Sequence, residues 1–363
     1  MFIYNRWYVA ALSSEVGEVP LARRILDHPV VLYRKADGTP VALSDRCPHR
    51  RYPLSLGKLR GDTLECGYHG FTFDCEGRCV SVPGQDQIPS RARVETYPVI
   101  QQGVWIWIWI ASPSTAGVAD SRSPKAVATD FAEGGPPDKT RLPETPWLVD
   151  GDEWRVVSSM TPLAARYELL VDNLLDLSHE TYLHAGYIGT PEVAATPIST
   201  SMDQVAGVVR VERHMHNVEC PTFYARSTKI EGRIDRWQDI EYFAPGYYLL
   251  HSRIAPAGTP LADDGSDPNA FHMKISYGIT PSTETSTYDF WAVSRDFALG
   301  DEEVSDALYK LNETVVSQDV TALDALEHRV ALDRNEFEVN IKIDKGGLAA
   351  RRLLKEMADA SRL

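Results

Sequence analysis

Two pairs of potential metal ligands lie near the start of the chain. One residue separates Cys47 from His49, and sixteen residues further on two residues separate Cys66 from His69. Two thiolates and two imidazoles can bind one zinc ion, or they can hold a [2Fe–2S] cluster with the thiolates on one iron and the imidazoles on the other. Zinc ribbons usually present C-x2-C at one end, and C-x-H leaves little chain between its ligands. The spacing therefore favours the cluster.

A second set of potential ligands lies at residues 170–184, where Asn173, Asp176, His179 and His184 follow one another. Leucines at helical spacing in the same segment predict that these polar groups lie beside a buried face. On a regular helix the two histidines point about 140° apart, so both reach one metal only if the helix bends or ends. Taken alone, histidines at this spacing are more often unrelated, and a third ligand is needed to support a site.

The third ligand is expected to be a carboxylate, because two histidines and one carboxylate hold non-haem iron and leave positions open. Apolar residues at steps of three, four and seven predict a helix over roughly residues 301–331. Asp319 interrupts this apolar stripe, where a carboxylate is costly unless it is paired or bound to a metal. Asp324 is the rival ligand, although it falls nearer the polar face. A salt bridge is the alternative role for Asp319.

The elements that must position the first ligand set are short strands. Asp37-Gly38 predicts a hairpin between residues 30–33 and 41–43, and Glu76-Gly77 predicts another between 71–73 and 80–81. Alternating tryptophan and isoleucine at residues 105–110 predict a strand between two apolar faces. We therefore expect an all-β domain at residues 1–110.

The rest of the chain has a different pattern. Residues 111–146 contain six prolines and three glycines and are predicted to form a linker or a long loop. Residues 147–363 are predicted to form an α+β domain, in which helices cover one side of an antiparallel sheet. Its predicted elements are a helix near 167–184, strands at 247–254, 272–279 and 288–293, and helices at about 301–331 and 347–360.

Composition and charge limit the possible partners and location. The chain has 363 residues, for which two domains are the usual expectation. Its net charge of -14 argues against nucleic acid, because phosphate binding needs a basic surface. The longest apolar run, at residues 104–111, is less than half a membrane span, and no secretory signal is evident. Five cysteines form no dense disulfide framework, so we expect a cytoplasmic protein with no membrane partner.

With CPHR, CGYHG and DNLLDLSHETYLH, the sequence resembles the oxygenase components of Rieske non-haem iron oxygenases. Within this family it resembles the vanillate O-demethylases and, more distantly, dicamba monooxygenase. The similarity runs nearly end to end and includes RWYVAAL, PLSLG, FAPGYYLL and VNIKIDKGGLAARRLL. The resemblance implies an N-terminal all-β Rieske [2Fe–2S] domain and a C-terminal helix-grip-like catalytic domain.

The resemblance also implies a role for each residue of the two constellations. Asp176 is expected to bridge a cluster histidine of one subunit and an iron-ligand histidine of the next, with Asn173 beside the iron site. Relatives form head-to-tail homotrimers because the two centres of one chain are too far apart for electron transfer. The implied ligands are Cys47, His49, Cys66 and His69 for the cluster, and His179, His184 and Asp319 for Fe(II).

The sequence departs from its relatives in three places. Arg51-Tyr52 replaces the small residues that usually follow CPHR, the linker is longer than expected, and residues 263–267 form an acidic patch. Respiratory-chain Rieske proteins join their two ligand loops by a disulfide, but the corresponding positions here are Tyr52 and Tyr68. The resemblance thus implies a disulfide-free domain, in which Cys75 and Cys79 are interpreted as buried thiols.

The activity implied by the resemblance is that of a monooxygenase using O2 to O-demethylate a methoxylated aromatic acid and release formaldehyde. Electrons are expected from NAD(P)H through a separate flavin/iron–sulfur reductase, since no G-x-G-x-x-G fingerprint is present. Ring hydroxylation, N-demethylation and desaturation are alternatives, and an electron carrier would need only the first 110 residues. Polar candidates for the substrate carboxylate, none of which the sequence places in a pocket, are His251, Arg253, Lys310 and Gln238.

Overall fold

The computed structural model describes residues 2–112, 137–261, 269–332 and 338–360. The chain divides into two compact units, the first reaching Pro143 and the second spanning Glu144–Ala360. Most of the predicted linker and the acidic patch at residues 263–267 lie outside the described residues. Within the described ranges, no helix is both long and apolar enough to cross a membrane.

The first unit consists of three antiparallel sheets, with strand orders β1-β11-β10, β2-β3-β4-β9 and β5-β6-β7-β8. Both predicted hairpins are confirmed, because β3 pairs with β4 and β7 pairs with β8. The described part of this unit contains short 3₁₀ helices but no α-helix. Its strands are β1 (Arg6–Leu12), β2 (Leu21–Ile25), β3 (His28–Arg34), β4 (Pro40–Ser44), β5 (Lys58–Arg60), β6 (Thr63–Glu65), β7 (Thr72–Phe73), β8 (Cys79–Ser81), β9 (Thr96–Tyr97), β10 (Val99–Gln102) and β11 (Trp105–Ile110).

Strand β11 is buried on both faces, as its alternating sequence predicts. All six residues are buried. Successive side chains of a strand point to opposite faces, so its isoleucines and its tryptophans lie on different sides. The isoleucines pack into a core with Tyr8 and Val30, while Trp109 contacts Trp7 at a ring-centroid distance of 5.6 Å. The strand therefore separates two apolar layers.

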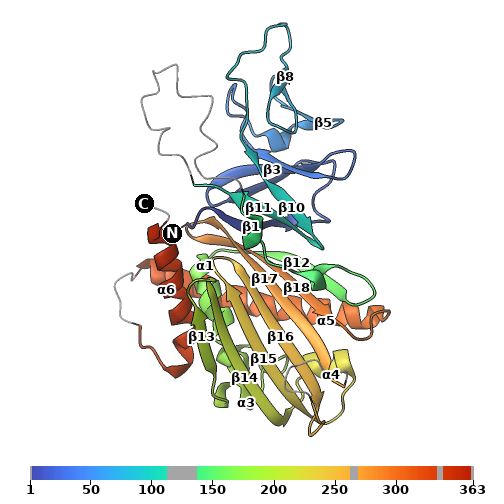
Figure 1. Ribbon diagram of the computed structural model, residues 1–363, viewed down its shortest axis with the longest axis vertical. Helices are drawn as coiled ribbons and strands as arrows, with labels where there is room; N and C mark the ends of the chain where they lie inside the picture. Colours follow the sequence, from blue (N-terminus) through green and yellow to red (C-terminus); the bar gives the residue numbers. More distant parts are fainter. Residues whose placement is uncertain (1, 113–136, 262–268, 333–337, 361–363) are drawn as a thin grey trace. The chain divides into compact units, whose positions relative to one another are not determined.

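The second unit is a seven-stranded antiparallel sheet with helices, in the order β12-β18-β17-β16-β15-β14-β13. Helix α1 lies on β17, α5 on β12, and α6 on β13 and β14 (Figure 1). The expected α+β architecture is confirmed. The strands are β12 (Arg155–Leu163), β13 (Ser199–Asp203), β14 (Val208–Glu219), β15 (Arg233–Phe243), β16 (Tyr247–Pro256), β17 (Phe271–Thr283) and β18 (Ser286–Arg295), and the helices are α1 (Tyr167–Leu175), α2 (Glu180–Leu183), α3 (Pro191–Ala195), α4 (Thr222–Thr228), α5 (Glu302–Leu332) and α6 (Lys345–Ala360).

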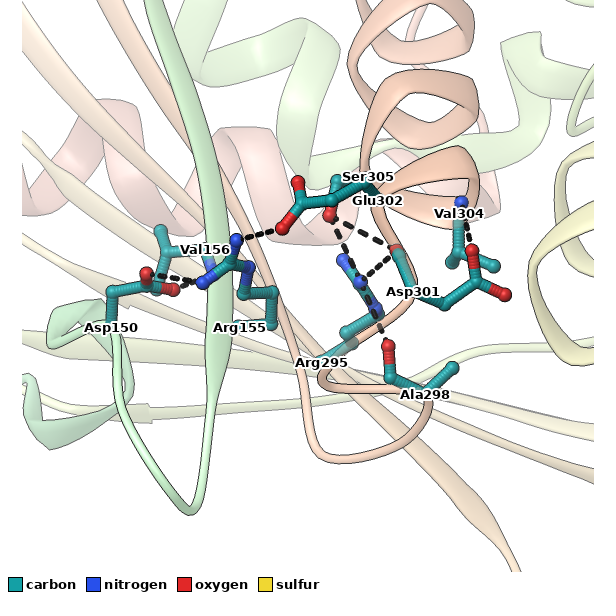
Figure 2. A network of polar contacts seen from close by, with 9 residues as sticks. All are labelled: Asp150, Arg155, Val156, Arg295, Ala298, Asp301, Glu302, Val304 and Ser305. Carbon is teal, nitrogen blue, oxygen red and sulfur yellow. Dashed lines mark hydrogen bonds and ion pairs between the residues drawn. The ribbon is translucent and has the colours of Figure 1, made fainter.

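The start of α5 is fixed to the sheet by a network of polar contacts (Figure 2). Asp301 accepts a hydrogen bond from the backbone N–H of Val304 at 3.1 Å, which caps the helix. Arg295, the last residue of β18, is fully buried and donates to the carbonyls of Ala298 and Asp301 and to the hydroxyl of Ser305. These contacts set the position of α5, which carries Asp319, relative to the sheet.

The same network supplies a stability test with its own control. Arg295→Met should lower the free energy of unfolding by about 2–4 kcal/mol, because buried carbonyl acceptors lose their donor. Arg155 lies opposite Arg295 on β12 but forms partly exposed ion pairs with Asp150 and Glu302. Arg155→Met should therefore cost only about 0–1 kcal/mol. Chemical denaturation of both variants measures the difference, and equal losses would contradict this account of α5.

Candidate metal sites

The two cysteine–histidine pairs lie on loops with the same backbone conformation. In the first loop the N–H of Cys47 donates to the carbonyl of Tyr52 at 2.9 Å. In the second loop the N–H of Cys66 donates to the carbonyl of Phe71 at 2.8 Å. Each loop is thus closed by a hydrogen bond across five residues, which holds the intervening ligand side chains at its tip.

The position four residues after each cysteine requires left-handed backbone. Arg51 and Gly70 donate to the carbonyls of Cys47 and Cys66 at 2.8 and 3.0 Å, and their φ angles are 61° and 71°. Glycine adopts this conformation without a Cβ penalty, whereas other residues pay roughly 1–2 kcal/mol. The departure at Arg51 therefore puts a strained residue at a position suited to glycine.

The four candidate cluster ligands differ in burial: the two cysteines are buried and the two histidines are exposed. Cys47 and Cys66 are 1% and 2% exposed, and their thiols contact each other. His49 and His69 are exposed at the loop tips, with ring centroids 4.5 Å apart. The two thiols thus lie below two solvent-facing imidazoles, as a cluster with cysteines on the inner iron and histidines on the outer iron requires.

The chemistry of these groups fits a metal cluster. Burial, with a smaller contribution from the neighbouring thiol of Cys66 and against opposing backbone hydrogen bonds, raises the pKa of Cys47 to about 11. Two buried thiolates in contact therefore need a cation between them. Desolvation, followed by the proximity of His69 and Arg50, lowers the pKa of His49 and favours the neutral imidazole that binds metals.

The remaining cysteines do not join this set. All five cysteines are free thiols. Cys79 is buried in an apolar cluster with Leu64 and Phe73, and its thiol donates to the carbonyl of Ser81 at 3.4 Å. Cys75 packs against the same cluster. Tyr52 and Tyr68, the positions of the disulfide in respiratory-chain proteins, are in ring contact at 5.3 Å. The two ligand loops are thus joined here by aromatic packing.

The second constellation is assembled by a break in the chain direction. Helix α1 ends at Leu175, Asp176 has extended backbone, and a 3₁₀ turn (Leu177–His179) leads into the short helix α2. His184 follows the end of α2. Both histidines could reach one metal only if the helix bent or ended between them, and this break meets that requirement. Their ring centroids lie 5.0 Å apart.

Helix α5 brings Asp319 to these two histidines. The Oδ1 atom of Asp319 lies 3.5 Å from Nε2 of His179 and 3.2 Å from Nε2 of His184. The ligand atoms of the three residues lie within 4.8 Å of one another. Asp324 instead accepts from the backbone N–H of Ala164 at 3.0 Å, away from the histidines.

The hydrogen bonds around the triad leave three acceptors facing one another. Nδ1 of His179 donates to the backbone carbonyl of Asp176 at 2.6 Å, and Nδ1 of His184 donates to the side-chain oxygen of Gln318 at 2.8 Å. Burial lowers the pKa of His184, but the Asp319 carboxylate and Gln318 raise it above the ordinary value. In the neutral rings each Nε2 presents a lone pair to the Asp319 carboxylate. A cation between the three groups removes this repulsion, so the donor set fits a two-histidine, one-carboxylate metal site.

Two further residues of the constellation lie beside the triad. Asn173 donates to Oδ1 of Asp319 at 3.0 Å and so fixes the carboxylate. The Asp176 carboxylate accepts from the backbone N–H of Ser178 at 2.9 Å, and it lies on a surface groove that is also lined by residues of α1, α5 and α6. It is the carbonyl of Asp176, and not its carboxylate, that contacts His179.

A cavity on the sheet side of the triad contains polar residues that sequence reasoning missed. The cavity is lined by Tyr248, Tyr277 and Asn312 together with the three candidate ligands. Tyr248 lies in the segment FAPGYYLL, and Asn312 precedes Asp319 by seven residues, which puts both residues on one face of α5. The spacing of Asn312 and Asp319 on one helix was the sequence signal that could have identified Asn312. No such signal exists for Tyr248 and Tyr277, because their strands are buried on both faces of the sheet.

None of the four polar candidates for substrate binding lines this cavity. His251 and Arg253 alternate with the cavity-lining Leu250 and so lie on the opposite face of the sheet. Lys310 is exposed on α5. Gln238 is buried on the helix-facing side, but its amide donates to the Glu180 carboxylate at 3.0 Å.

Comparisons with known proteins cover nearly the whole chain. The Rieske [2Fe–2S] domain family matches residues 6–98, and the vanillate O-demethylase oxygenase C-terminal domain family matches residues 163–360. The iron–sulfur subunit of the toluene-4-sulfonate monooxygenase system of Comamonas testosteroni is 32% identical, over 99% of this chain and 98% of its own. The vanillate O-demethylase oxygenase subunit of a Pseudomonas species is 30% identical with the same coverage. The crystal structure of dicamba monooxygenase bound to dicamba matches with a TM-score of 0.84 at 30% identity, over 99% of both chains.

Proposed function

Because the chain belongs to the Rieske non-haem iron oxygenases, as an oxygenase component of the vanillate O-demethylase type, we propose that it O-demethylates a methoxylated aromatic acid. Proteins of this family contain a Rieske [2Fe–2S] cluster and a non-haem iron, and they take electrons from a reductase. The observation that carries the proposal is the convergence of His179, His184 and Asp319 beside a cavity with aromatic walls.

In this proposal the two constellations hold the two metal centres. Cys47 and Cys66 bind one iron of the cluster, and the exposed His49 and His69 bind the other. The mononuclear iron is held by the triad on α5 and around α2. Exposed cluster histidines suit the transfer of electrons from a separate NAD(P)H-dependent flavin/iron–sulfur reductase, which the chain requires because it lacks a nucleotide fingerprint.

The overall reaction sets what the protein must provide. An aryl methyl ether, O2, two electrons and two protons give a phenol, formaldehyde and water, with the oxygen-to-methyl bond broken. When bound, the iron supplies the activation of O2 next to the substrate. The protein orients the ligands through Asn173 and Gln318 and keeps water out through the apolar side chains of Leu174, Leu177 and Val315.

We further propose a head-to-tail homotrimer in which Asp176 connects neighbouring subunits. Its carboxylate lies on a surface groove, and its carbonyl holds the ring of His179. A group from another subunit that binds in this groove would therefore contact Asp176, which in turn contacts the iron ligand His179. In a closed ring of three heterologous interfaces, the groove of each subunit is occupied by its neighbour.

A second candidate function is hydroxylation of an aryl methyl group. Relatives at about 30% identity include a toluene-4-sulfonate monooxygenase subunit, a dicamba O-demethylase and a chloroacetanilide N-alkylformylase. Vanillate, dicamba and toluene-4-sulfonate each carry an anionic group on an aromatic ring. An anionic aromatic substrate is therefore common to both candidates, and the oxidised carbon distinguishes them.

Product analysis tests the proposed reaction. The holoenzyme, supplied with a surrogate reductase, NADH and O2, should release equimolar formaldehyde and phenol from 3-methoxybenzoate and no product from benzene. Formation of a benzylic alcohol from 4-methylbenzenesulfonate, with no formaldehyde from any methoxybenzoate, would support the second candidate instead. A cis-diol would place the enzyme among the ring dihydroxylases and contradict both.

A further inference from the structure

Three hydrogen-bonding side chains line the cavity beside the triad. Tyr248, Tyr277 and Asn312 are 1%, 7% and 4% exposed, and all three line this cavity. Within the described part of the chain, the buried amide nitrogen of Asn312 has no hydrogen-bond partner. Nearly all buried polar groups in folded proteins are satisfied, so the unpartnered amide of Asn312, beside two phenol hydroxyls in the same cavity, indicates a ligand.

The two phenols face the cavity from adjacent strands. Tyr248 on β16 is directly opposite Tyr277 on β17, so both side chains lie on the same face of the sheet. Their rings meet edge to face at a centroid distance of 5.6 Å. Burial raises the pKa of each phenol well above its ordinary value, so both hydroxyls remain protonated donors.

The third donor reaches the cavity from the helix layer. Asn312 precedes Asp319 on α5 by two turns, which is about 10 Å along the helix axis. A group bound at Asn312 is thus separated from the metal site by a distance comparable to the length of a substituted aromatic ring.

Charged groups of both signs lie around Tyr248, whereas those that act on Tyr277 are acidic. Arg213 is 3% exposed, acts electrostatically on Tyr248, and makes only a long hydrogen bond of 3.5 Å to Gln238. Arg236 also lines the cavity and is paired with Glu180 at 3.0 Å. Glu180 and Asp319 act on Tyr248 in the opposite sense, but the first is paired with Arg236 and the second belongs to the metal site.

We propose that Tyr248, Tyr277 and Asn312 form a subsite that binds the anionic oxygen group of the aromatic substrate, a carboxylate or a sulfonate. This inference rests on the proposed function, because it takes the cavity to be the substrate site. Three donors from three elements match a group with several acceptor oxygens better than an ether oxygen, which accepts from fewer donors. The subsite holds the anion and directs the opposite part of the ring toward the metal.

Equilibrium binding to the holoenzyme tests the subsite without relying on turnover. The probes are 3-methoxybenzoate, 3-methoxybenzenesulfonate and methyl 3-methoxybenzoate, measured by dialysis in the absence of NADH. Tyr248→Phe, Tyr277→Phe and Asn312→Leu should each weaken the better-bound acid by about tenfold, since a hydrogen bond to a charged group is lost. The neutral ester should change much less.

Tyr247→Phe is the matched control. Tyr247 is the preceding residue of β16 and is 3% exposed, but its hydroxyl contacts Ser276 at 3.3 Å and its side chain lies on the other sheet face. It should bind all three probes as the wild type does. Metal content and thermal melting of each variant establish that the fold and both centres are retained.

The outcomes separate the subsite from the proposed reaction. If the wild type binds neither acid better than the ester, or if all three variants bind the acids as the wild type does, the subsite is wrong whatever the reaction. If the variants lose acid binding but the wild type releases no formaldehyde, the subsite stands and O-demethylation fails. The better-bound of the two acids identifies the anion.

Discussion

Asp319→Ala should abolish turnover and remove the mononuclear iron while the purified protein keeps the brown colour of its cluster. The reason is that Asp319 supplies the carboxylate of the triad, with its Oδ1 atom close to Nε2 of both histidines. Two neutral imidazoles without an anionic ligand hold Fe(II) weakly, because carboxylate oxygen provides the charge that this hard cation prefers. The cluster ligands are on separate loops and are unaffected.

Iron and acid-labile sulfide analysis measures this result. The wild type should contain about three irons and about two sulfides per chain, and the variant about two of each. Asp324→Ala is the matched control, because Asp324 lies on the same helix and bonds only the backbone N–H of Ala164. The control should retain its iron and its activity. A full iron content in Asp319→Ala, or iron loss in the control, would show that the carboxylate ligand was assigned to the wrong residue.

The two ligand sets could be found from the sequence because their spacing is local. The C-x-H and C-x2-H pairs need only two turns, and the structure adds that both turns have the same hydrogen bonds. Asp319 was identified as a carboxylate that interrupts an apolar helical stripe, which burial in the structure explains. In each case a side chain of unusual type stands in a regular pattern, and pattern is what a single sequence reveals.

The substrate side of the cavity could not be found in the same way. Strands β15, β16 and β17 are buried on both faces over much of their length, so alternation does not tell which face a residue occupies. The charged residues His251 and Arg253 were plausible ligands for an acid, but strand register places them on the face away from the helices. The cavity instead presents two phenols and an amide beside the paired Arg236, and only the unpartnered amide of Asn312 marks them as a binding site.

Asp176→Asn should leave both metal centres loaded and yet lose nearly all turnover. The substitution keeps the backbone carbonyl that holds His179 and can keep the side-chain acceptor for Ser178, so the iron site is not disturbed. It removes the negative charge and turns the second oxygen into a donor, which cannot accept from a histidine of a neighbouring subunit. Unchanged iron and sulfide contents with wild-type turnover would contradict the bridging role.

Subunit mixing determines whether that bridge acts between chains. His49→Ala removes the cluster of a subunit and leaves its iron, whereas His179→Ala disables the iron and leaves the cluster. Each variant alone should be inactive, but an equimolar mixture should regain up to about one quarter of wild-type activity, because one ordered pairing in four joins an intact cluster to an intact iron in a head-to-tail ring. Adding Asp176→Asn to the His49→Ala subunit, which supplies the working iron site, should abolish the rescue, whereas adding it to the His179→Ala subunit should not. Rescue that is absent despite confirmed subunit exchange would mean that electrons pass within one chain, and Asp176 would then need a different role.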